Sequence, residues 1–104
     1  VTWTTPLVAT NGGQQAGCII TNVGTKPITV TVELVSGSGF TVTPVAASCP
    51  VPPATLAPRF TCQAVGPVGS DVYCIVQASS GKVRAGITVF ESGGIFGGFV
   101  PATK

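Results

Sequence analysis

The sequence contains no histidine and only three acidic residues among its 104. A serine or cysteine nucleophile normally relies on a histidine base, and a glycosidase needs two carboxylates that face each other. The three acidic residues, Glu33, Asp71 and Glu91, are widely separated in the chain, and each is explained as an ordinary solvated charge. These absences lead us to expect a protein that is not an enzyme.

Charge of either sign is scarce, since charged residues make up 8% of the chain and hydrophobic residues 44%. No apolar run approaches the roughly 18 to 20 residues that span a bilayer, so we expect no membrane span. The basic residues are scattered along the sequence, without the basic stripe typical of nucleic-acid binding, and we expect no nucleic-acid partner. They are Lys26, Arg59, Lys82, Arg84 and Lys104.

Cysteine is the one chemically versatile residue that is well represented, at positions 18, 49, 62 and 74. These spacings contain no Cys-x2-Cys pair, and the chain offers no histidine ligand, so we expect neither a metal nor a cofactor. An even cysteine count in a short chain is typical of disulfides formed in an oxidising compartment. We therefore expect a protein that is secreted, periplasmic or displayed on the cell surface.

The start of the chain fits this location. The sequence has no methionine, not even at Val1, so an upstream segment was removed or the sequence starts at a chosen point. A cleaved export signal is the simpler explanation.

Alternation of apolar and polar residues predicts β-strands throughout. The clearest run, Ile28 to Leu34, reads ITVTVEL, and no window of ten or more residues has helical periodicity free of Gly or Pro. Pro6 indicates that the first strand lies at a sheet edge. Strands are predicted at residues 2–9, 15–22, 28–34, 40–43, 60–65, 72–78 and 82–91.

About seven short strands separated by turns predict an all-β fold, an antiparallel immunoglobulin-like β-sandwich, with a small Greek-key β-barrel as the alternative. We place the sandwich at residues 1–91 and interpret residues 92–104 as a Gly-rich apolar tail or an added edge strand. Strand phase puts Cys18 and Cys74 on buried faces, which favours a disulfide between the two sheets. The remaining pair, Cys49 and Cys62, would then close a proline-rich loop.

One hairpin resembles a known class of domain. The stretch from Cys18 to Leu34, CIITNVGTKPITVTVEL, is similar to the strand-turn-strand of bacterial secreted and surface immunoglobulin-like modules, including those related to cell-adhesion domains. The chain departs from antibody-type domains, because the strand at 28–34 has no tryptophan and Tyr73 directly precedes Cys74. The resemblance implies a non-catalytic extracellular module and identifies no binding residue.

Two segments are candidates for binding a partner. Residues 49–62, CPVPPATLAPRFTC, form a proline-rich loop with Arg59 and Phe60 near its end, and a constrained loop of this kind can act in a protease inhibitor. The alternative is that proline only stiffens a connection between the sheets.

The second candidate is the tail, where large apolar side chains stand among glycines, including Ile95, Phe96 and Phe99. These side chains could dock on their own sandwich as a last edge strand, or add to another subunit and form a homo-oligomer. We expect a structural, adhesion or protein-interaction module that binds an unknown protein or surface polymer. A small protease inhibitor that acts through Arg59 is the alternative.

Overall fold

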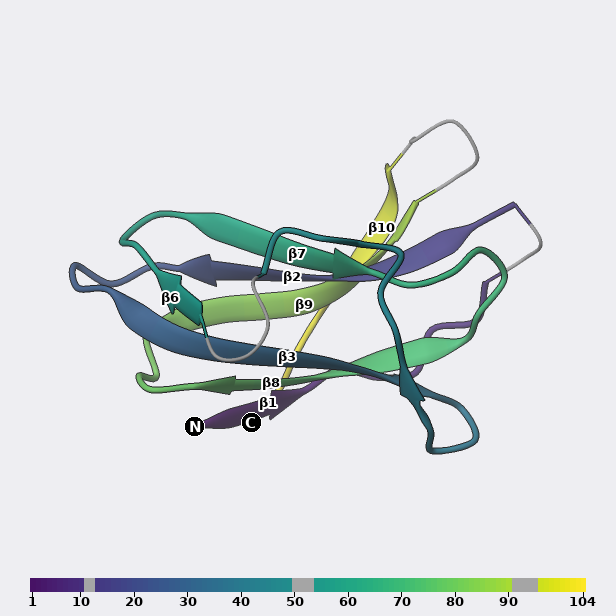
Figure 1. The fold of residues 1–104 in the computed structure, drawn as a ribbon, viewed down its shortest axis with the longest axis horizontal. Coiled ribbons are helices and arrows are strands. Elements are labelled where there is room, and N and C mark those ends of the chain that lie inside the picture. The colour runs from purple at the N-terminus through teal and green to yellow at the C-terminus, as the bar shows by residue number, and fades with distance from the viewer. Residues whose placement is uncertain (11–12, 50–53, 91–95) are drawn as a thin grey trace.

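The computed structural model describes residues 1–10, 13–49, 54–90 and 96–104. These residues form ten strands and no helix, arranged as two antiparallel sheets that do not close into a barrel (Figure 1). The prediction of an all-β sandwich is therefore confirmed, and the barrel alternative is wrong.

Each sheet combines strands from both halves of the chain. The first sheet has the order β1-β8-β3-β4, and β6 also pairs with β3; the second sheet has the order β10-β9-β2-β7-β5. In the first sheet the strands are β1 (Thr2–Thr4), β8 (Val72–Ala78), β3 (Ile28–Ser36), β4 (Thr41–Val42) and β6 (Ala54–Leu56). In the second they are β10 (Phe96–Pro101), β9 (Val83–Phe90), β2 (Gln15–Asn22), β7 (Thr61–Val65) and β5 (Ala46–Ala47).

A disulfide between Cys18 and Cys74 joins the two sheets at their centre. Cys18 lies in β2 of the second sheet and Cys74 in β8 of the first, with their Cα atoms 6.1 Å apart. Both residues are fully buried. This bond, called the inter-sheet disulfide below, has the pairing that the strand phase favours.

The second disulfide, between Cys49 and Cys62, also lies in the core. Its Cα atoms are 4.8 Å apart, and both half-cystines belong to the second sheet or its immediate continuation. Between them the chain crosses to the first sheet, where β6 pairs with β3 and buries Leu56. This loop disulfide therefore holds both ends of a crossover between the sheets.

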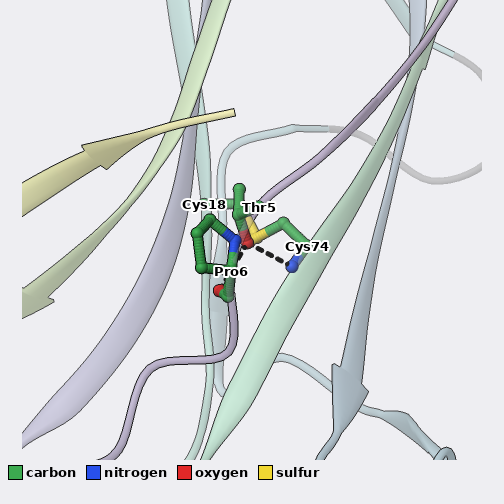
Figure 2. Close-up of a disulfide and its surroundings, with 4 residues drawn as sticks. All are labelled: Thr5, Pro6, Cys18 and Cys74. Atoms are coloured by element: carbon green, nitrogen blue, oxygen red, sulfur yellow. Dashed lines mark hydrogen bonds between the residues drawn. A yellow bond between two sulfur atoms is a disulfide. The ribbon is translucent and has the colours of Figure 1, made fainter. Parts of the chain in front are cut away.

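Thr5 continues the edge strand beyond β1, beside the inter-sheet disulfide (Figure 2). Its backbone N–H donates to Cys74 O at 3.0 Å, and Cys74 N–H donates to Thr5 Oγ1 at 2.8 Å. The hydroxyl also donates to Pro6 O at 3.1 Å. Pairing resumes at Val8, and the whole segment lies at the edge of the first sheet, as Pro6 predicts.

The C-terminal segment adds the edge strand β10 to β9. Beyond β10 it reaches the other sheet, since Thr4 and Thr103 exchange two backbone hydrogen bonds of 2.8 and 3.0 Å. The end of the chain thus connects the neighbouring edges of the two sheets.

Candidate interaction surface

Three loops lie at one end of the sandwich, on the left in Figure 1. The strand register brings them together, because the last residue of β2, Asn22, pairs with the first residue of β9, Val83. Thr21 pairs with Thr61 at the start of β7. The loops that follow β2, precede β7 and precede β9 therefore share this end.

The side chain of Asn22 fixes two of these loops, the β2–β3 turn and the segment between β6 and β7, from inside the protein. It is fully buried, and its Nδ2 donates to Lys26 O at 2.8 Å and to Leu56 O at 3.0 Å. Its Oδ1 accepts from Gly24 N at 2.9 Å. A single amide thus uses both donors and its acceptor to join the β2–β3 turn to the end of β6.

The backbone completes the connection. Asn22 N donates to Phe60 O at 3.0 Å, and Arg59 N donates to Asn22 O at 2.8 Å. The next residue, Val23, donates from its N–H to Lys82 O at 3.1 Å. The loops at 23–27, 57–60 and 79–82 are therefore held as one unit by backbone bonds that do not depend on the exposed side chains.

All five basic residues lie on this unit or beside it. Lys26, Arg59 and Lys82 belong to the three loops, and Arg84 pairs across the sheet with Thr21. Lys104 is adjacent, since its Nζ lies 3.6 Å from the point that a Cβ on Gly81 would occupy. The interpretation of these residues as scattered was wrong in three dimensions, and we call this region the basic end.

The described acidic side chains lie away from the basic end. Asp71 precedes β8, whose last residue is at the basic end, and it accepts from Thr10 N at 2.9 Å. Glu33 is five residues into β3, roughly 17 Å from its start at the strand rise, and accepts from Thr41 Oγ1 at 3.2 Å. Glu91 is outside the described residues. The described acidic side chains are thus separated from the basic residues along the direction of the strands.

Two large apolar side chains are exposed among the cations. Phe60 is 63% exposed and Val23 is 50% exposed, and each directly adjoins the Asn22 backbone connection. Exposed apolar side chains that lie together and are bordered by polar groups can mark an interaction site. The surface of the basic end is therefore both cationic and apolar.

A hollow of about 370 Å³ lies between the β2–β3 and β8–β9 turns, with Lys26 and Lys82 in its wall. Ser79 Oγ accepts from Thr29 N, and Ser80 Oγ accepts from Lys82 N. Each hydroxyl therefore has its proton left to donate, since a hydroxyl can donate and accept at once. Two ammonium groups and two hydroxyl donors can bind an anionic oxygen here.

Arg59 adopts a conformation unlike that of a protease inhibitor's binding loop. Its φ is 66°, in the left-handed region, and its turn is closed by Phe60 N donating to Ala57 O. An inhibitory segment of the type considered from the sequence would be extended. The proline-rich segment instead forms the crossover between the sheets, which was the alternative interpretation.

The tail residues predicted for binding lie elsewhere. In β10, Phe96 pairs with Phe90 and Phe99 with Thr88, which places the start of β10 at the end of β9 that is remote from the basic end. Ile95 lies outside the described residues. The fold thus separates the tail candidates from Arg59 and Phe60.

In the described part of the chain, no helix is long and apolar enough to cross a membrane, and no three His, Cys, Asp or Glu side chains gather as metal ligands. The two disulfides indicate an oxidising, extracytoplasmic environment.

No protein-family model and no curated protein matches the sequence. Solved structures of distant proteins have a similar fold. A crystal structure of Thermotoga maritima 1070 has a TM-score of 0.65 and 10% identity, covering 98% of this chain and 91% of that one. Anabaena sensory rhodopsin transducer has a TM-score of 0.53 and 16% identity, covering 84% of this chain and 92% of that one. At these identities the similarity concerns the fold alone.

Proposed function

We propose that the protein is a secreted or cell-surface β-sandwich module of immunoglobulin-like type, without catalytic activity, that binds its partner through the basic end. The observation that carries this proposal is that hydrogen bonds of Asn22 and of the Val23 backbone hold three loops in place, while these loops display cations and exposed apolar side chains together. A surface that is rigid before binding loses less conformational entropy when a partner docks.

The sequence and the disulfides support the same proposal. Both disulfides are buried and suit a small domain outside the reducing cytoplasm. The absence of histidine from the chain leaves the usual acid-base catalysis without its most common residue. The inhibitor alternative has less support, because Arg59 occupies a tight turn with positive φ.

The test compares binding of purified protein to cell envelopes isolated from the source cells. The variant Lys26→Ser/Arg59→Ser/Lys82→Ser removes three charges from the basic end. Its matched control adds three acidic residues at exposed positions of the opposite end, Ala9→Glu/Ser38→Glu/Val68→Glu. Both variants change the formal charge from +2 to −1, since 2 − 3 = −1.

The proposal predicts that only the first variant loses envelope binding. Equal loss in both variants would show that net charge alone governs binding, and equal retention would show that the partner binds elsewhere. Either result contradicts the proposal. Thermal unfolding of both variants establishes that each is folded before binding is compared.

A further inference from the structure

We infer, on the basis of the proposed function, that the partner of the basic end is a bilayer surface that contains anionic phospholipid. Phe60 and Val23 enter the headgroup region, while Lys26, Arg59 and Lys82 bind lipid phosphates. The inference rests on the combination of exposed apolar and cationic side chains in three loops that hydrogen bonds of Asn22 and Val23 hold together.

The apolar residues favour a membrane over a soluble polyanion. A nucleic acid or an acidic polysaccharide offers phosphate, sulfate or carboxylate groups to the cations, and a nucleic acid also offers bases that can stack on Phe60. Neither provides an apolar layer for the aliphatic Val23, which is 50% exposed. A bilayer interface accepts aromatic and aliphatic side chains and, at the same depth, presents phosphate to nearby lysine and arginine.

The hollow beside these residues can hold a headgroup. It is lined by Lys26, Lys82, Ser79 and Ser80, which supply two positive charges and two hydroxyl donors. Gly24 lies against the stem of Lys82, because a Cβ at Gly24 would come within 3.2 Å of Lys82 Cβ. This contact keeps the base of the Lys82 side chain beside the turn.

The charge separation gives the bound protein an orientation. The long strands β2, β3, β8 and β9 run along the longest axis of the molecule in Figure 1, with the basic end at one extreme. Asp71 and Glu33 lie away from that end and are repelled by an anionic surface. The sandwich therefore stands on the membrane with its basic end down.

The expected strength of membrane partitioning follows from the number of side chains that contact the bilayer. A lysine or arginine near an anionic bilayer contributes roughly a fivefold increase in partitioning, so removing three lowers it about 100-fold. Burying a phenylalanine side chain contributes at least about tenfold. The inference requires both the cationic and the apolar contribution to binding. Cations alone would not distinguish a membrane from another polyanion.

The experiment measures cosedimentation with vesicles of phosphatidylcholine, with or without about a third of phosphatidylglycerol, at low and high salt. The wild type is expected to bind the anionic vesicles, less strongly at high salt. Lys26→Ser/Arg59→Ser/Lys82→Ser is expected to lower partitioning about 100-fold and Phe60→Ser about tenfold or more. The controls are Ala9→Glu/Ser38→Glu/Val68→Glu for charge and Leu7→Ser, which removes a side chain 51% exposed at the opposite end.

A second variant, Phe60→Trp, keeps the aromatic side chain and reports its surroundings. Its fluorescence should shift to the blue with anionic vesicles, while the buried Trp3 contributes a constant background. Absence of the blue shift would overturn the inference. Competition by glycerol phosphate that abolishes vesicle binding at millimolar concentration would also overturn it, because the free anion would then suffice.

Other outcomes separate this inference from the proposed function. Envelope binding that requires the basic end, together with no binding to anionic vesicles, would overturn the lipid assignment and leave the proposed function standing. The protein could instead bind a single-stranded oligonucleotide or a sulfated polysaccharide more strongly than vesicles, without any effect of Phe60→Ser. That result would also overturn the lipid assignment and leave the proposed function standing. Binding to vesicles that the charge-removal variant retains would contradict both.

Discussion

Replacement of Asn22 by alanine or by aspartate tests whether its amide hydrogen bonds hold the basic end together. Asn22→Ala removes three bonds, of which the one to Leu56 O is buried and the other two are partly open to water. A buried carbonyl left without a donor costs about 1 to 3 kcal/mol, and each partly open bond contributes about 0.5 to 1 kcal/mol. The total loss of unfolding free energy is therefore about 2 to 5 kcal/mol.

Asn22→Asp is the sharper variant because it preserves shape and the acceptor for Gly24 N–H while removing both donors. At neutral pH the introduced carboxylate would face two carbonyl oxygens, Lys26 O and Leu56 O, in a fully buried site. Burial of an unpaired charge is at least as costly as loss of the hydrogen bonds. We therefore expect Asn22→Asp to be no more stable than Asn22→Ala.

Urea denaturation provides the assay, with the unfolding midpoint and slope measured for wild type and both variants. With a slope of about 1.5 kcal/mol per molar urea, the midpoint falls by about 1 to 3 M. Thr25→Ala, an exposed change in the same turn, is the control and should shift the midpoint little. An Asn22→Asp variant as stable as the wild type would refute the role of the two donated bonds.

Three further predictions concern stability. Removing the inter-sheet disulfide by paired alanine substitutions should cost roughly 4 kcal/mol and removing the loop disulfide roughly 3, because their sequence separations are 56 and 13; the reverse order of urea midpoints would contradict this. Arg59→Gly should stabilise the protein by about 0.5 kcal/mol, because the energetic cost of a left-handed arginine exceeds the conformational entropy that glycine loses on folding. A lower melting temperature of this variant would contradict the prediction. Thr5→Val should cost about 1 to 3 kcal/mol by leaving Cys74 N–H unpaired, whereas exposed Thr4→Val should cost little by the same thermal measurement.

The long strands were predictable because their side chains alternate between a buried and an open face. β2 and β8 have the predicted bounds, and Ala16, Cys18 and Ile20 on one face of β2 are all fully buried. The same alternation placed Cys18 and Cys74 facing inward. A periodic pattern over seven or eight residues carries enough information to specify which face is buried.

Two of the short strands, β5 and β6, were not predicted, because two or three residues cannot display a period. β5 contains two residues and β6 three, and their pairing depends on β7 and β3, which lie far away in the sequence or across the crossover. The sequence interpretation that proline stiffens a connection between the sheets stays a prediction, since Pro50, Pro52 and Pro53 lie outside the described residues.

The basic end was missed for the same reason. Lys26 and Lys82 are separated by 56 positions in the sequence and meet only because β2 pairs with β9. Arg59 and Phe60, which the sequence suggested as interaction residues, are exposed in the structure and lie beside the neighbouring turns.

The most direct measurement is an amide spectrum of isotopically labelled protein titrated with small bicelles that contain anionic phospholipid. The largest shifts and line broadening should occur in the loops at 23–27, 57–60 and 79–82, and the loops at 37–40 and 66–71 should change little. Changes confined to the opposite end, or spread evenly over both sheets, would contradict binding through the basic end.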